Sequence, residues 1–256
     1  MKIATWNVNS LRARQDVVLD WVEANEPDVL CLQETKLSDQ EFPEDEFGDL
    51  DCDAHFWGQK SYNGVAIITP HEAQRVIRGF QDPVWDEDKR VIAARVNGID
   101  VIDIYLPNGQ SYGSDKYRYK LAWMDRLVDW LDQHFDPEDP VLLCGDFNIA
   151  PTALDHCGPE DSSEQLFTSE GERTRYRRFL DWGFVDAFRH LHPQERAYTW
   201  WDYRGMAFQR NEGMRIDHVL VTPSLLARLN DVTVHRALRS EEAPSDHVPV
   251  VAEFDP

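Results

Sequence analysis

The stretch Val141-Leu-Leu-Cys-Gly-Asp-Phe-Asn-Ile-Ala-Pro151 indicates a buried strand that ends in polar residues. It starts with an apolar run of the length expected for a strand that is buried on both faces. It ends with Asp146 and Asn148, so it would deliver a carboxylate and an amide from its carboxyl end, where open α/β sheets place their active sites. Because Asp and Asn also favour turns, a purely structural turn is the alternative.

The N-terminal part of the chain repeats this pattern. Apolar strands are predicted at 3–8 and 29–33, separated by an amphipathic helix at 14–24 whose apolar residues recur at helical spacing. Glu34 follows the second strand directly. The β-α-β order predicts an α/β core, with a carboxylate again at the end of a buried strand. The alternative role for Glu34 is to cap a following helix.

Antiparallel strands are predicted as well, so the sheets should be mixed. Residues 91–96 and 99–105 flank Asn97-Gly98, a strong two-residue hairpin signal. No repeat or low-complexity linker interrupts residues 1–256, so we predict one domain with two mixed β-sheets packed face to face and helices outside. The remaining predicted elements are helices at 116–135 and 174–182 and strands at 55–57, 64–69, 141–144, 198–201, 215–221, 232–238 and 248–254.

The composition is that of a soluble globular protein. The hydrophobic fraction is 42%, no apolar run is long enough to span a membrane, and the N-terminus lacks a signal-peptide pattern. The four cysteines are widely spaced, and Cys31 and Cys144 lie in apolar strands, where free thiols act as small hydrophobic groups. We therefore expect a cytoplasmic protein with reduced cysteines, no structural zinc and no membrane contact.

The formal net charge of −21 is opposite in sign to that of a typical nucleic-acid-binding protein. Much of the acid lies in two segments, 38–53 and 155–172. Basic residues cluster elsewhere, at 116–120, 173–178 and 204–215. Either the partner is not nucleic acid, or the basic residues are concentrated on one face.

Polar side chains recur where predicted strands begin or end. No cysteine is among them, so the set favours a hard cation such as Mg²⁺ or Mn²⁺ over zinc. Such a cation, with carboxylates and a histidine, suits phosphoryl transfer to water. Taken singly, Asp246-His247 could be a surface pair and Tyr105 a packing residue. The full set is Asn7, Glu34, Tyr105, Asp146, Asn148, Asp217, Asp246 and His247.

The joint pattern closely resembles the exonuclease III branch of the endonuclease/exonuclease/phosphatase superfamily. The resemblance extends over 2–254, and its short motifs are weak singly but highly specific in this order. The superfamily motifs are Thr-Trp-Asn-Val-Asn at 5–9, Leu-Gln-Glu-Thr-Lys at 32–36, Gly-Asp-Phe-Asn at 145–148, Arg-Ile-Asp at 215–217 and Ser-Asp-His at 245–247. The branch motifs are Tyr-Asn-Gly-Val-Ala-Ile at 62–67, Tyr105 with Pro107-Asn108, and Tyr-Thr-Trp-Trp-Asp-Tyr-Arg at 198–204.

This resemblance implies a four-layered α/β sandwich and a Mg²⁺-dependent DNA repair nuclease, with Mn²⁺ as the alternative metal. The implied substrate is double-stranded DNA with abasic sites or 3′ ends, and the protein is expected to be a monomer. Glu34 would hold the metal with Asn7 and Asp246 near it. The wider set assigned to the metal by resemblance is Asn7, Glu34, Asp146, Asn148, Asp246 and His247.

The catalytic roles also follow from the resemblance. Asp146 would orient or deprotonate the attacking water, and Asn148 would help to hold the phosphate. Asp217 would fix the tautomer of His247, which would contact the phosphate, and Tyr105 would line the same site. Whether one or two metals act stays open, as does the choice of base between Asp146 and the Asp217–His247 pair.

A substrate pocket is implied at Trp200, Met214 and Ile216, because an abasic sugar fits a shallow apolar pocket that excludes a full nucleotide. Arg204 would probe the duplex, and Asn108 would also contact the substrate. Core packing is the alternative for Trp200. A basic rim and bound metal would then offset the acidic charge and allow DNA to bind.

Two other functions compete with a DNA repair nuclease. One is a superfamily phosphatase that acts on small phosphoesters or lipids; the motifs at 62–64 and 200–204 favour DNA instead. The other is a non-catalytic DNA-binding protein, which is disfavoured because every position of the catalytic set carries a suitable residue.

Overall fold

Two six-stranded mixed sheets form the centre of the computed structural model, which describes residues 1–159 and 162–255. The first sheet has the order β11-β12-β1-β2-β4-β3, and the second has the order β5-β6-β7-β8-β10-β9. The first is built from β1 (Lys2–Asn7), β2 (Val29–Gln33), β3 (Asp53–Trp57), β4 (Val65–Thr69), β11 (Leu229–Val234) and β12 (Val250–Phe254). The second is built from β5 (Ala73–Arg78), β6 (Val91–Val96), β7 (Ile99–Tyr105), β8 (Val141–Asp146), β9 (Val185–Asp186) and β10 (Asp217–Val221).

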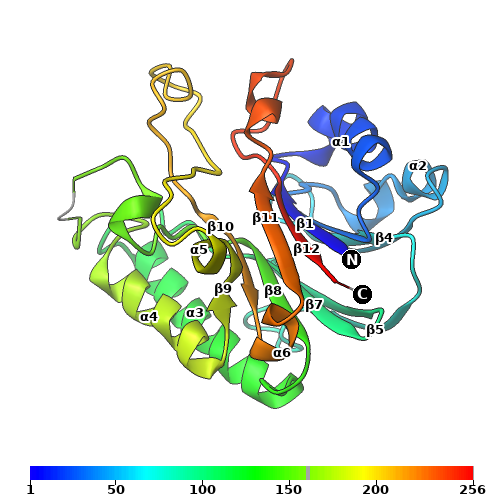
Figure 1. Cartoon of the computed structure of the whole chain (residues 1–256), viewed down its shortest axis with the longest axis horizontal. Coiled ribbons are helices and arrows are strands. Elements are labelled where there is room, and N and C mark those ends of the chain that lie inside the picture. Colours follow the sequence, from blue (N-terminus) through cyan, green and yellow to red (C-terminus); the bar gives the residue numbers. More distant parts are fainter. Residues whose placement is uncertain (160–161, 256) are drawn as a thin grey trace.

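Helices cover the outer face of each sheet, which confirms the predicted α/β sandwich of two mixed sheets with flanking helices (Figure 1). The main helices are α1 (Leu11–Asn25) beside the first sheet and α3 (Asp115–His134) and α4 (Glu170–Trp182) beside the second. Shorter helices connect the strands: η1 (Asp39–Glu41), α2 (Glu44–Gly48), η2 (Ala153–Asp155), α5 (Ala187–Leu191), α6 (Pro223–Leu226) and η3 (Arg236–Ser240). No helix in the described part of the chain is long and apolar enough to cross a membrane.

The central strands are apolar without interruption because both of their faces are covered. In β8, Leu142 and Cys144 pack between the two sheets, whereas Val141 and Leu143 pack against α3 and α4. Cys31 of β2 also lies between the sheets, fully buried, as predicted for a free thiol in an apolar strand.

The topology brings the polar strand ends to one edge. β1 and β2 are parallel and joined through α1, and β7 and β8 are parallel and joined through α3. β10 runs antiparallel to β8 with Asp217 opposite Asp146, so the start of β10 meets the end of β8. Position 145, in β8 next to Ile104 of β7, requires glycine. Its φ is 137°, and a Cβ there would lie 1.9 Å from the carbonyl oxygen of Ile104.

The largest differences between prediction and structure concern three elements. Residues 198–201 form no strand; Trp200 makes only isolated bridges to Met214 and His247. The strand predicted at 232–238 is β11, which ends at Val234 and is followed by the short helix η3. Helix α4 starts four residues before its predicted start, because Ser169 and Glu172 form a capping box ahead of the apolar residues.

The first acidic segment contributes little to the core, whereas the second carries the buried carboxylates of Asp155 and Glu172. Residues 38–53 form η1 and α2, whose acidic side chains are largely exposed while Phe47 is buried. The second acidic segment, 155–172, includes residues 160 and 161, which lie outside the described residues.

Candidate active site

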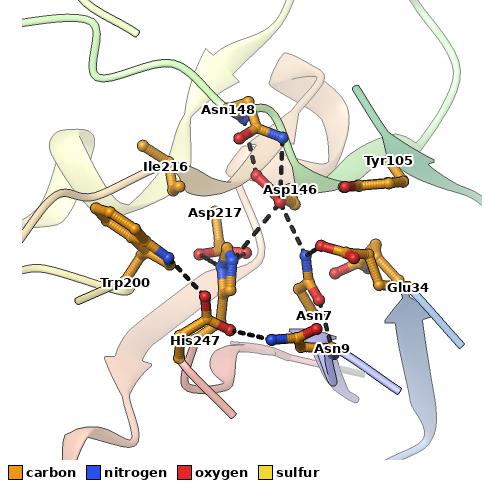
Figure 2. Close-up of polar contacts among 12 residues, drawn as sticks. Asn7, Asn9, Glu34, Tyr105, Asp146, Asn148, Trp200, Ile216, Asp217 and His247 are labelled. Atoms are coloured by element: carbon orange, nitrogen blue, oxygen red, sulfur yellow. Dashed lines mark hydrogen bonds and ion pairs between the residues drawn. The ribbon is translucent and has the colours of Figure 1, made fainter. Parts of the chain in front are cut away.

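The ends of β1, β2 and β8, the start of β10 and the loop before β12 converge at one edge of the sandwich (Figure 2). Eight predicted residues of the site meet there, and hydrogen bonds join most of them to a neighbour of the set. They are Asn7, Glu34, Tyr105, Asp146, Asn148, Asp217, Asp246 and His247.

Asn7 links the two sheets through its amide group. Its Nδ2 lies 2.9 Å from Oε1 of Glu34 and 2.9 Å from Oδ2 of Asp146, and it donates to both. Its Oδ1 accepts from the backbone N–H of Asn9 at 2.9 Å. Since a backbone N–H can only donate, this bond fixes the amide with its NH₂ group toward the carboxylates. Asn7 therefore holds two acids together, and its role as a metal ligand stays a prediction.

His247 is buried and bound to Asp217. Its Nδ1 lies 2.9 Å and 3.1 Å from the two oxygens of Asp217, and its Nε2 lies 3.8 Å from Oδ2 of Asp146. Burial lowers the pKa of the ring, but the carboxylates of Asp217 and Asp146 outweigh it and raise the pKa of His247 to about 10. The geometry thus favours an imidazolium that can donate a hydrogen bond from Nε2.

Asp146 is the most strongly perturbed carboxyl of the site. Burial raises its pKa to about 7, and the charges of Asp217 and Glu34 act in the same direction, against the opposing effects of His247 and Asn7. A carboxyl group with a pKa near neutrality can take a proton from water at physiological pH. Such a shift is typical of functional sites.

Asp246 directly precedes His247 in the chain and is half-buried. Its two oxygens accept from Nδ2 of Asn9 and from Nε1 of Trp200, each at 2.9 Å. Burial alone would raise the pKa of Asp246, but the His247 cation and these two hydrogen bonds lower it below its usual value. Asp246 therefore stays ionised beside the site.

Asn148 adopts a left-handed backbone conformation, with a φ of 51°. Its backbone N–H donates to Oδ1 of Asp146 at 2.8 Å, and its Nδ2 donates to the carbonyl oxygen of Leu106 at 2.9 Å. Its Oδ1 accepts from Nδ2 of Asn108 at 3.2 Å. Glu34 has a left-handed φ of 52° as well. Such backbone strain in non-glycine residues gathers at functional sites.

Tyr105 ends β7 with its hydroxyl turned toward Asp146 and Glu34 (Figure 2). Burial raises its pKa well above the usual value, and the charge of Glu34 adds to this effect. The guanidinium of Arg90 lies 4.7 Å from the centre of the ring and orients it. Tyr105 is therefore a neutral hydrogen-bond donor at the edge of the site.

The residues predicted to contact substrate fall into two groups. Trp200 and Ile216 border the carboxylates (Figure 2). Met214 pairs with Trp200 through two backbone hydrogen bonds of 3.0 Å. Asn108 reaches the site through Asn148. Arg204 does not join them: its side chain is 93% exposed and pairs with Asp202.

Sequence reasoning missed several residues that position the site. Lys36 lies 2.9 Å from Oε2 of Glu34, and Asn9 binds Asp246. Ser245 donates to the carbonyl oxygen of Asn7 and accepts from the backbone N–H of His247. Thr199 accepts from the backbone N–H groups of residues 216 and 217. All four lie inside the motifs quoted above, which was the available signal.

The donor set fits a hard divalent cation. Ligand atoms of Asp146, Asp217 and His247 lie within 4.8 Å of one another. The raised pKa of Asp146 shows that its negative charge is poorly compensated. Asp217 and His247 already bind each other, so Glu34 and Asp146, both held by Asn7, are the carboxylates best placed to hold a metal. A ligand role for His247 would first require loss of its proton.

The sequence profile of the endonuclease/exonuclease/phosphatase family matches residues 4–247. The chain belongs to this family. Exodeoxyribonuclease III of Haemophilus influenzae is 37% identical to it, over 99% of this chain and 100% of the relative. An exodeoxyribonuclease of Bacillus subtilis is 35% identical over 98% of each chain. These matches confirm the resemblance inferred from the motifs.

Solved structures of family members have the same fold. An AP endonuclease from Archaeoglobus fulgidus superposes with a TM-score of 0.96 at 42% identity, over 100% of both chains. The 3′ phosphatase NExo (D146N) from Neisseria, bound to product DNA hairpin, superposes with a TM-score of 0.95 at 43% identity, over 100% of this chain and 99% of that one. The two packed mixed sheets are therefore the architecture of this endonuclease/exonuclease/phosphatase protein.

Proposed function

We propose that this family member is a Mg²⁺-dependent DNA repair nuclease that hydrolyses phosphodiester bonds at abasic sites and at 3′ ends. The observation that carries the proposal is the joined set of Asn7, Glu34, Asp146 and the Asp217–His247 pair. Relatives that match nearly the whole chain are named exodeoxyribonuclease and AP endonuclease.

Each protein group has a role that its geometry supports. Asp146, with a pKa near 7, accepts a proton from the attacking water. His247, held as an imidazolium by Asp217, donates from Nε2 to a phosphate oxygen as negative charge develops there. Asn148, two residues after the end of β8, and Tyr105, at the end of β7, contribute neutral donors.

A divalent cation held by Glu34 and Asp146, with Asp246 near it, would neutralise the phosphate and stabilise the leaving oxygen. We propose Mg²⁺ because all three acids offer oxygen donors and no thiol lies among them. Mn²⁺, which has similar ligand preferences, is the alternative.

The preference for abasic DNA rests on the apolar border of the site. Trp200 and the buried Ile216 lie beside the catalytic residues (Figure 2), and Met214 forms an isolated backbone bridge with Trp200. An apolar wall of this kind accepts a sugar without a base, and flipping costs least where stacking is already lost. Trp200 also donates to Asp246, so one residue connects the pocket with the carboxylates.

The acidic charge restricts how the protein engages DNA. With a net charge of −21, we propose that a few basic side chains and the bound metal capture the phosphates. Binding should weaken as salt rises, with a shallow slope that reflects few phosphate contacts. A slope that indicates ten or more contacts would contradict this mode of binding.

We further propose that residues 1–256 act as one domain, as a monomer, in the cytoplasm. Sedimentation of the purified protein tests the oligomeric state, and limited proteolysis tests the single domain. Fractionation of the host cell tests the location.

The test of function is a Mg²⁺-containing incubation with labelled duplexes, one with an abasic-site analogue and one with an intact recessed 3′ end. Incision at the analogue identifies the endonuclease, and shortening of the second duplex identifies the exonuclease. A chelator should abolish both. No product from either duplex, together with phosphate release from a small ester, would instead favour a phosphatase.

A further inference from the structure

Lys120 of α3 is completely buried, and its charge is paired with the equally buried carboxylate of Glu172 in α4. Its Nζ donates to Oε1 of Glu172, to the carbonyl oxygen of Asn148 at 2.7 Å and to the carbonyl oxygen of Asn108 at 3.3 Å. An ammonium group has three hydrogens, and each therefore has an acceptor. Lys120 joins three segments that are distant in the sequence.

Two of these acceptors, the carbonyl oxygens of Asn148 and Asn108, belong to residues at the edge of the active site. Asn148 has a left-handed φ of 51°, and its carbonyl oxygen accepts from Nζ of Lys120 in α3 at 2.7 Å. The side chain of Asn148 meanwhile stays hydrogen-bonded to Asp146 and Asn108. Lys120 thus stabilises the strained backbone of Asn148, a residue whose side chain points into the active site.

The third acceptor, Glu172, extends the connection to the substrate pocket. Its carboxylate accepts from the backbone N–H of Phe167 at 3.2 Å, and the carbonyl oxygen of Phe167 accepts from Ala150 at 2.7 Å. The ring of Phe167 lies 5.1 Å from Nζ of Lys120 and 6.4 Å from the ring of Trp200. The buried ion pair therefore supports both Asn148 and the residue packed against Trp200.

Stability alone does not account for this ion pair. Desolvation of two charges offsets most of their attraction, and apolar residues of similar volume often replace buried pairs at no cost. Burial lowers the pKa of Lys120, and Glu172 opposes that effect. What an apolar pair could not supply is a set of donors for the carbonyl groups of Asn148 and Asn108.

We propose that Lys120 is a positioning residue that acts through Asn148 and sets the orientation of its amide toward the phosphate. This inference rests on the proposed nuclease function. Small displacements of a catalytic group cost large factors in rate, about a hundredfold for 1 Å. Loss of Lys120 should therefore lower kcat much more than it raises KM.

A double-mutant cycle with Asn148 tests this coupling. Lys120→Met keeps the length of the side chain and removes its donors; in the otherwise unchanged protein it should lower kcat roughly tenfold or more. In the Asn148→Ala background the same substitution should change kcat less than twofold, because the group that it positions is gone. Equal effects in both backgrounds would overturn the proposal.

Folding is separated from positioning by a neutral pair. Lys120→Met alone leaves Glu172 buried without its partner and can destabilise the fold. Lys120→Met combined with Glu172→Gln removes both charges, so its melting temperature should recover while kcat stays low. Recovery of kcat to within twofold of the unsubstituted protein would show a purely structural role.

A matched control breaks another ion pair between the same helices. Asp125 of α3 pairs with Arg175 and Arg178 of α4 away from the active site. Asp125→Asn should leave kcat and KM within twofold. If the unsubstituted protein cleaves no DNA duplex with Mg²⁺ present, the nuclease function fails, whereas an active protein with an additive cycle refutes only the role of Lys120.

Discussion

Both oxygens of Asp217 lie within hydrogen-bonding distance of Nδ1 of His247, at 2.9 Å and 3.1 Å. This contact places the ring hydrogen on Nδ1, directs Nε2 toward the site, and helps to raise the pKa of the imidazole to about 10. Asp217 of β10 is paired with Asp146 of β8. This strand pairing places Asp146, the proposed proton acceptor, beside the imidazolium of His247.

Substitution of Asp217 tests this arrangement. Asp217→Asn removes the negative charge next to the ring, so the pKa of His247 should fall. We expect kcat to drop by about a hundredfold or more and the alkaline limb of the pH–rate profile to move to lower pH. Asp129→Asn, which removes the same charge from an exposed position of α3, is the control. An unchanged profile for Asp217→Asn would remove this residue from the mechanism.

The pH dependence of the unsubstituted protein follows from the two perturbed groups. Asp146 must be deprotonated to accept a proton, and its pKa is raised to about 7. His247 must be protonated, and its pKa is raised to about 10. A cation bound at Glu34 and Asp146 would lower both pKa values, so kcat/KM should rise at or below neutral pH and fall only on the alkaline side, where His247 loses its proton. A maximum below pH 6 would show that a different group accepts the proton.

Glu34 is predicted to set the affinity for the metal. Glu34→Gln keeps its size and its contact with Asn7 but removes the charge. The Mg²⁺ concentration needed for half-maximal activity should rise tenfold or more, and calorimetric titration with Mn²⁺ should show the same loss of affinity. Glu46→Gln, an exposed acid of α2, should leave both values unchanged. Equal Mn²⁺ affinity in Glu34→Gln would place the metal elsewhere.

His218 predicts how stability depends on pH. Its Nδ1 accepts from Arg215 and its Nε2 donates to Ile149, so the buried ring is neutral. Burial and Arg215 lower its pKa from 6.5 to about 4. Between these values the unfolded chain binds the proton and the folded chain does not, so stability falls as pH decreases from about 6.5 to about 4.

At pH 5 this single group should cost roughly 2 kcal/mol relative to pH 7. Urea unfolding at both pH values measures the difference. His218→Gln lacks the titrating ring, so its stability should change less over the same interval even where it is lower at both pH values. An identical pH dependence in the two proteins would assign the effect to other groups.

The sequence predicted the central strands well because burial on both faces leaves an unambiguous apolar run, as in Val141–Cys144. It missed β5 (Ala73–Arg78), whose side chains are largely exposed and carry no continuous apolar pattern. It assigned a strand to 198–201 because aromatic residues favour strands. There the rings of Tyr198 and Trp201 instead pack in a separate cluster with Val248.

The members of the site could be predicted, but their connections could not. Asn7, Asp146 and His247 stand in recognisable motifs, so their residue types and order were informative. The bond from Asn7 to Asp146 joins residues 139 positions apart on different sheets, and no local pattern encodes it. The role of Lys120 was hidden for the same reason, since a lysine on an amphipathic helix is expected to face solvent.

The most direct test of the central claim compares the unsubstituted protein with Asp146→Asn in single-turnover cleavage of a duplex with an abasic-site analogue. Mg²⁺ is present, and duplex binding is measured in parallel. We predict that the unsubstituted protein incises the analogue, whereas Asp146→Asn binds it with similar affinity and cleaves it at least a hundredfold more slowly. Equal cleavage rates for the two proteins would contradict the assignment of Asp146 as the group that activates water.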